Sequence, residues 1–144
     1  MPKHPRVVSP VTSLFARDDI EIALISVELW PQRVVVRLAA LPNEITEEQQ
    51  RLYESEFEGW GRGASGDPPE QPGTRLLEPL EVAVEDDAGT AYAPVSGNTG
   101  GTGSEWHGDW FFGAEVPESV ERLTVRVSAP GGETANVELA FGDD

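Results

Sequence analysis

Apolar and polar residues alternate along at least five segments of this chain, a period that is typical of strands with one buried face. The clearest segments are residues 20–24, 34–38, 80–84, 123–127 and 137–141. Turn-forming residues separate the first pair at Pro31-Gln32 and the last pair at Pro130-Gly131-Gly132, so a hairpin is predicted at each place. Together these patterns predict an all-β fold. We expect an immunoglobulin-like β-sandwich of seven or eight mostly antiparallel strands, with a small barrel as the alternative.

The first long strand changes parity along its length. Apolar residues occupy even positions up to Leu24 and odd positions from Ile25 to Leu29. Such a switch indicates either a β-bulge near residues 24–25 or a strand that is covered on both faces there. The preceding residues 1–19 are expected to form an arm that leads into this strand.

The centre of the fold is expected between residues 80 and 112. A strand at 80–84 is followed by the turn-forming run Asp86-Asp87-Ala88-Gly89, from which the chain is expected to return as a hairpin. The next segment, 97–103, is so rich in glycine that we expect a flexible loop. An aromatic strand then begins at Trp106.

The two faces of this aromatic strand have different compositions. Because alternate residues of a strand share a face, one face would be apolar and is predicted to point into the core. Its residues are Trp106, Gly108, Trp110 and Phe112. The small residue Gly108 would allow close packing, and His107 and Asp109 would project together from the opposite face.

A helical insertion is predicted between residues 42 and 75. Thr46-Glu47-Glu48-Gln49 matches a capping box, and Gly59 to Gly63 would end the helix after about three turns. Its apolar face would consist of Ile45, Leu52, Tyr53, Phe57 and Trp60. We expect the helix to cap an open end of a sheet rather than to bind a partner. Residues 61–74, rich in proline and glycine, are predicted to form a mobile surface loop.

Composition narrows the possible functions. The net charge of −16 argues against binding to nucleic acids or anionic membranes. The absence of cysteine excludes thiolate catalysis, cysteine-based zinc sites and disulfides. No segment is apolar enough to span a bilayer, and the N-terminal segment lacks the pattern of a signal peptide, so a cytoplasmic location is expected. A length of 144 residues predicts one domain, residues 1–144.

Only one pattern in the sequence points towards catalysis. His107 and Asp109 could supply two metal ligands, or a general base with its orienting acid. The other histidine, His4, lies near the chain end, so a third partner is not evident. Asp86 and Asp87 lack the spacing of a calcium loop and are better explained as a turn. We therefore expect no enzyme activity, no metal and no cofactor.

The predicted function is binding. A non-enzymatic protein-interaction domain is the first hypothesis, and a carbohydrate-binding module that uses exposed tryptophans is the alternative. The first would show an uncovered strand edge or an apolar patch. The second requires at least two exposed, coplanar tryptophans. The candidate contact residues are Trp60, Trp106, His107, Asp109 and Trp110.

Several motifs carry a family resemblance. They are Asp86-Asp87-x-Gly89-Thr90-x-Tyr92, the glycine-rich run, Trp106-His107-Gly108, Phe112, and Pro117 with Leu123-Thr124-Val125. In these motifs the chain resembles a group of small β-sandwich proteins of unknown function, mainly from actinobacteria. The resemblance covers about half of the chain, residues 82–127. It implies the fold and no particular activity.

Overall fold

The computed structural model describes residues 5–63, 66–102 and 105–141. These residues form nine strands in two antiparallel sheets, together with two helices. The larger sheet contains β1 (Arg6–Val8), β2 (Thr12–Arg17), β3 (Ile20–Trp30), β4 (Arg33–Ala40), β6 (Ala93–Thr102) and β7 (Glu105–Gly113). The smaller sheet contains β5 (Glu81–Asp86), β8 (Arg122–Ser128) and β9 (Thr134–Ala140). The helices are α1 (Glu44–Gly61) and α2 (Pro72–Leu77).

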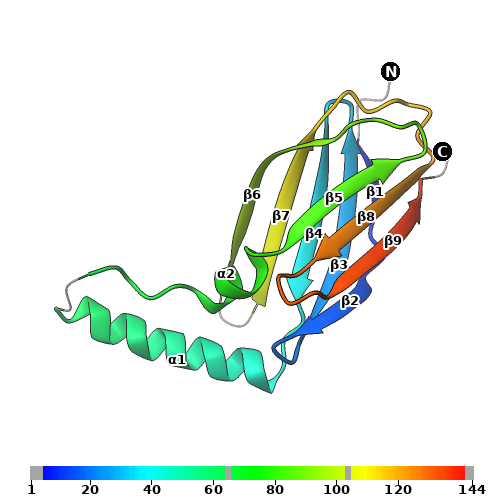
Figure 1. The fold of residues 1–144 in the computed structure, drawn as a ribbon. Coiled ribbons are helices and arrows are strands. Elements are labelled where there is room, and N and C mark those ends of the chain that lie inside the picture. Colours follow the sequence, from blue (N-terminus) through cyan, green and yellow to red (C-terminus); the bar gives the residue numbers. More distant parts are fainter. Residues whose placement is uncertain (1–4, 64–65, 103–104, 142–144) are drawn as a thin grey trace.

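The two sheets form a sandwich, so the predicted all-β sandwich is confirmed. The larger sheet has the order β3-β4-β7-β6, with β1 and β2 both paired to β3, and the smaller sheet has the order β5-β8-β9. Figure 1 shows the smaller sheet lying over one face of the larger sheet. The predicted count of seven or eight strands is too low, because β1 and β2 lie in the segment that was expected to be an arm.

Alternate residues of the strands fill the space between the sheets. Fully buried examples are Ile20, Ile22, Leu24, Val34, Val36, Leu38, Leu123 and Val125, each with 0% exposure. Each such side chain contributes about 1.5–3 kcal/mol relative to an exposed one. The pairing of β3 with β4 shifts register between Leu24 and Ser26, which confirms the first of the two predicted alternatives, a bulge. The bulge keeps apolar residues on the core face in both halves of β3.

The hairpins predicted at Pro31-Gln32 and at Pro130-Gly131-Gly132 are both present. β3 and β4 pair from Ile22 with Ala40 to Trp30 with Arg33. β8 and β9 pair across the turn at residues 130–132, where Gly132 has a φ of +103°. A positive φ is the conformation that glycine adopts without a steric penalty.

The predicted hairpin after residue 84 is wrong. The turn itself is as expected, since Asp86 Oδ1 accepts hydrogen bonds from the amides of Ala88 (2.9 Å) and Thr90 (3.0 Å). Gly89 has a φ of +74°. However, β5 pairs with β8 in the smaller sheet, whereas the chain beyond the turn crosses to the larger sheet and becomes β6. The turn residues determine that the chain reverses direction at this point. They do not determine which sheet the next strand joins.

The glycine-rich segment is a strand over its described part, so the loop prediction is wrong there. Residues 93–102 form β6, which pairs with β7 along its length. The last residue of the predicted loop, 103, lies outside the described part. Glycine weakens a strand by its entropy and its lack of a side chain, so β6 depends on its ladder with β7.

Helix α1 begins earlier than predicted and ends at Gly61, within the predicted range of Gly59 to Gly63. Its N-cap is Asn43, whose Oδ1 accepts a hydrogen bond from the Thr46 amide (2.9 Å), while Thr46 Oγ1 accepts one from the Asn43 amide (2.9 Å). Thr46 is therefore the N3 residue, the last of the capping box, and not its first. The helix has 18 residues, which is longer than three turns.

Helix α1 does not cap a sheet. Figure 1 shows that it projects from one end of the sandwich. Thr46 in its first turn is fully buried, whereas Leu52 (54%) and Phe57 (44%) are exposed. The expected packing fails because the helix is attached near its start and most of its apolar face finds no sheet beneath it.

Helix α2 corrects the end of the predicted mobile loop, residues 72–74. Pro72, Gly73, Leu76 and Leu77 are buried, so this part of the insertion belongs to the core. A side chain at Gly73 would place its Cβ 2.7 Å from Trp106 Cγ, which makes glycine necessary for this contact. Residues 64–65 of the predicted loop lie outside the described part. Neither described helix is long and apolar enough to cross a membrane.

Candidate functional site

Strand β7 directs its aromatic side chains as the sequence predicts. It pairs with β4 without a register shift, with Trp106 opposite Ala40 and Trp110 opposite Val36. Because the ladder is continuous, both indoles lie on the core face and His107 lies on the other. Trp106 is 3% exposed, and its Nε1 donates a hydrogen bond to Gln50 Oε1 of α1 (3.4 Å). Trp110 is half-buried and packs against the edge of the core.

Two glycines lie beside the Trp110 ring. A Cβ at Gly108 would lie 2.7 Å from Trp110 Cη2 and Cζ3, so the ring lies directly over the backbone of its own strand. A Cβ at Gly97 would lie 3.6 Å from Trp110 Cδ1, which places the other end of the indole beside β6. Gly108 is therefore required for the close packing of the Trp110 ring, whereas a Cβ at Gly97 would make an ordinary van der Waals contact with it.

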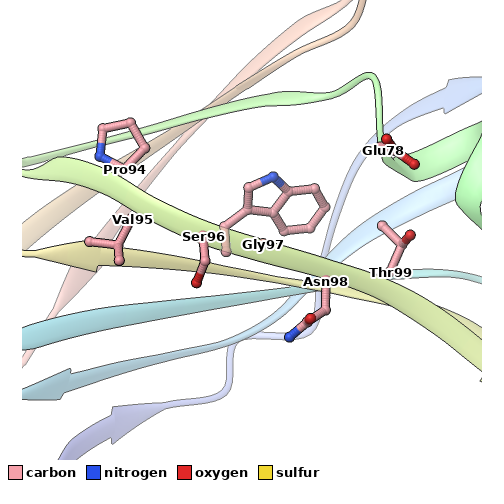
Figure 2. A pocket seen from close by; sticks show the side chains of 8 residues that line it. Glu78, Pro94, Val95, Ser96, Gly97, Asn98 and Thr99 are labelled. Atoms are coloured by element: carbon pink, nitrogen blue, oxygen red, sulfur yellow. The ribbon is translucent and has the colours of Figure 1, made fainter.

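A pocket opens beside this ring. Its volume is about 450 Å³, within the range of about 300–1,000 Å³ of ligand sites. It is lined by Glu78, Pro94, Val95, Ser96, Gly97, Asn98, Thr99 and Trp110. Figure 2 shows Glu78 and Thr99 at one end of the lining and Pro94 and Val95 at the other. The lining thus combines an aromatic surface, hydroxyl and amide groups, and one carboxylate.

Helix α2 holds Glu78 beside β6. The Glu78 amide donates a hydrogen bond to the Thr74 carbonyl (2.9 Å) at the C-terminal end of the helix. Thr99 Oγ1 of β6 donates a hydrogen bond to Thr74 Oγ1 (3.1 Å). The backbone that carries Glu78 is therefore tied to the strand, whereas its side chain is exposed to solvent.

Strand β6 is an edge of the larger sheet. Among the described residues it pairs with β7 alone, and Figure 1 shows it at the margin of the sandwich. Its ten residues include no charged side chain. The pairing with β7 is irregular between Pro94 and Ser96, where Val95 is 69% exposed. Backbone groups on the outer side of such a strand are available for another strand.

The opposite face of β7 carries an ion-pair network. Asp109 Oδ1 accepts a hydrogen bond from Arg37 Nη1 (2.9 Å), and Arg37 Nε donates to Glu28 Oε2 (3.1 Å). Burial favours a raised pKa for Glu28, but hydrogen bonds from Trp30 and Arg37 outweigh it and lower the pKa. Asp109 is therefore engaged by Arg37, while His107 is exposed. This arrangement does not make Asp109 the orienting acid of a His107 base.

Trp60 lies on α1, away from the other candidates. Its Nε1 donates a hydrogen bond to the Gly66 carbonyl (3.0 Å). Its ring centroid is 5.5 Å from that of Phe57, which in turn is 5.9 Å from Tyr53. These rings line one side of the projecting helix, so Trp60 belongs to a different surface from Trp110.

The five predicted contact residues therefore do not converge. Trp106 is in the core, Trp60 is on α1, and His107 and Asp109 face away from the pocket, so Trp110 is the member of the set that lines it. The sequence analysis missed Glu78, Asn98 and Thr99. The absence of charge along residues 93–102 was a signal for an unusual edge, but nothing local links Glu78 to it.

Within the described residues, no group of three or more histidine, aspartate or glutamate side chains could hold a metal ion.

Comparisons with known proteins give one informative likeness. No family model and no curated protein matches the sequence. A solved structure, a conserved domain protein from Bacillus anthracis, is similar with a TM-score of 0.53 and 12% sequence identity. The match covers 96% of this chain and 49% of that protein, so the chain spans about half of its length. At this identity the likeness concerns the fold alone.

Proposed function

We propose that this chain is a non-enzymatic, immunoglobulin-like interaction domain that binds an extended segment of a partner protein by adding it as a strand to β6. The observation that carries the proposal is the long, uncharged edge of β6 beside a pocket. Strand addition takes its affinity from main-chain hydrogen bonds and its specificity from pockets for alternate side chains. The β6 edge offers both.

The neighbouring sheet edge supports this assignment by contrast. β5, an edge of the smaller sheet, exposes Glu81 and Glu85. Charged side chains on an edge discourage pairing with another chain. β6 is long and carries no charged side chain, so it lacks these two protections against strand pairing. The binding of a partner strand would account for this exposed edge.

The immunoglobulin-like assignment rests on strand order. Constant-type immunoglobulin domains pair strands ABED in one sheet and CFG in the other. If β3 corresponds to strand A, the larger sheet reads A-B-E-D as β3-β4-β7-β6, and the smaller reads C-F-G as β5-β8-β9. On this reading the helices occupy the connection between strands B and C, and β1 and β2 precede strand A.

Peptide display on the folded protein tests the proposal, followed by binding measurements on two proline variants, Asn98→Pro and Thr99→Pro. Successive amides of a strand point to opposite edges, so one variant loses an amide that serves β7 and the other an amide on the free edge. The variant that retains the ladder should fold and bind selected peptides at least about tenfold more weakly.

The matched controls are Asn98→Ala and Thr99→Ala, which keep both amides. They should retain most of the affinity. Equal binding of the selected peptides to the parent and to both proline variants would rule out strand addition at β6.

Glycan binding is the second candidate, and the aromatic lining of the pocket favours it. Trp110, Thr99 and Glu78 combine a ring with hydrogen-bonding groups, as sugar sites do. Trp106 cannot complete a two-ring platform because it is 3% exposed. Retention of the parent on a polysaccharide column, and its loss in Trp110→Ala, would favour this candidate over strand addition.

A further inference from the structure

We infer that the pocket beside Trp110 accepts a lysine or arginine side chain of the strand bound at β6. This inference rests on the proposed function and adds to it the chemistry of the bound segment. It follows from three features of the pocket: its position relative to the edge, the groups that line it, and the charge around it.

The position of the pocket suits a side chain of an added strand. Gly97 and Thr99 of β6, together with Trp110 of β7, line it from the core side of the larger sheet. In a strand added beside β6, alternate side chains point to this same side. At least one of them would therefore lie over the opening of the pocket, next to Gly97.

The lining groups favour a cation with an apolar stem. Pro94 and the Trp110 ring provide apolar surface for the methylene groups of a long side chain. Glu78 is the charged residue of the lining, and its side chain is exposed to solvent. A cation over an indole face is attracted by the ring, and a carboxylate within reach adds a charge-assisted hydrogen bond.

The surrounding charge acts in the same direction. The lining contains no lysine or arginine, and the chain carries a net charge of −16. A negative potential of this kind accelerates association with positively charged segments and disfavours acidic ones. An acidic or neutral side chain in the pocket would leave Glu78 without a partner of opposite charge.

Host–guest peptides test the inference directly. The probe is a short, acetylated and amidated peptide of alternating threonine and valine, with lysine, arginine, norleucine or glutamate at one central position. Norleucine matches the stem of lysine without its charge. The lysine and arginine peptides should bind the parent about tenfold more tightly than the norleucine peptide, and this preference should shrink as salt is added.

Two variants with the same change in net charge distinguish the effect of the carboxylate in the pocket from the effect of the overall negative charge of the protein. Glu78→Gln should remove the preference for lysine over norleucine and leave the affinity of the norleucine peptide unchanged. Glu85→Gln, on the exposed face of β5, should leave the preference intact.

The outcomes also separate the two proposals. Equal affinity of the lysine and norleucine peptides for the parent, or a lysine preference that survives in Glu78→Gln, would overturn the cation pocket while leaving strand addition in place. If none of the peptides perturbs the amide resonances of β6, strand addition itself fails and the inference fails with it.

Discussion

The two edges of the larger sheet are built differently. On one side, β1 and β2 have only three and six residues, and they are separated by a break at which Val11 has a φ of +43°. The guanidinium of Arg6 donates hydrogen bonds to the carbonyls of Val120 (2.6 Å) and Pro117 (3.2 Å), and β2 lies beside β9. On the other side, β6 continues for ten residues without a charge.

This difference distinguishes an edge that is protected against strand pairing from an edge that is exposed to it. Short strands, breaks, bulges and edge charges are the means by which proteins prevent unwanted strand pairing, and the β1–β2 edge uses several of them. β6 has an irregularity at its start, between Pro94 and Ser96, but its remaining residues, 96–102, pair regularly with β7 and carry no charge. In the proposed function, the exposed edge is the one that binds a partner, and the pocket beside it gives specificity.

The first prediction has the largest expected effect and compares the two tryptophans near β6, the open edge of the larger sheet. Trp106→Ala should cost about 3–5 kcal/mol of unfolding free energy, because it empties a buried site beneath α2. Trp110→Ala should cost less, about 1–3 kcal/mol, since its ring is half-buried and borders the pocket. Chemical denaturation of both variants measures the difference. A larger loss for Trp110→Ala would mean that the open edge is as tightly packed as the core.

The second prediction concerns the edge formed by β1 and β2. Arg6→Ala removes the hydrogen bonds to Val120 and Pro117 and should cost about 1–3 kcal/mol, with β1 the first strand to lose protection in hydrogen exchange. Arg126→Ala on β8, whose exposed side chain bonds Asn136, is the matched control and should cost under about 1 kcal/mol. Equal effects would mean that Arg6 does not anchor the edge.

The third prediction concerns the turn that leads to the open edge. Asp86 also accepts a hydrogen bond from the Tyr92 hydroxyl (2.7 Å). Burial favours a raised pKa for Asp86, but hydrogen bonds from Thr90 and Tyr92 outweigh it and lower the pKa below its ordinary value of 3.8. A group with a lowered pKa stabilises the fold above that ordinary value, and this contribution is lost as the pH falls through the folded-state pKa.

Asp86→Asn should therefore reduce the loss of stability that occurs below about pH 3.8. Near neutral pH it should lower the free energy of unfolding by about 1 kcal/mol. Thermal melts between pH 2 and pH 7 measure it. An unchanged acid limb in the variant would show that other carboxylates set the acid stability.

The smallest expected effect is on the open edge itself. Ser96→Lys, at an exposed position of β6, should change the unfolding free energy by less than about 0.5 kcal/mol. It should nevertheless weaken strand addition, because edge lysines oppose pairing. A large loss of stability would mean that this edge is packed and not free.

Local patterns were sufficient to predict the two hairpins, the bulge in β3 and the two faces of β7. In each case a period of two residues, or a turn residue, contains the information. They failed where structure depends on distant partners. β1 is three residues long and exists because β3 pairs with it, and β6 is a strand despite its glycines because β7 supplies the ladder.

The candidate site was predicted only in part, for the same reason. Trp110 was among the candidates because its strand could be recognised. Glu78 comes to the pocket through the packing of α2 against Trp106, which requires a glycine at position 73. Neither the sheet crossing after Asp86 nor this packing has a local signature. The resemblance to actinobacterial β-sandwich proteins stays a prediction.

The central claim is that β6 is where a partner binds, and a titration of the isotope-labelled protein with a display-selected peptide, followed by amide resonances, tests it most directly. The account predicts that the largest shifts fall on residues 93–102, with new contacts between the peptide backbone and β6 and a shift of the Trp110 indole. Shifts concentrated on α1, around Leu52 and Phe57, with β6 unchanged, would contradict it.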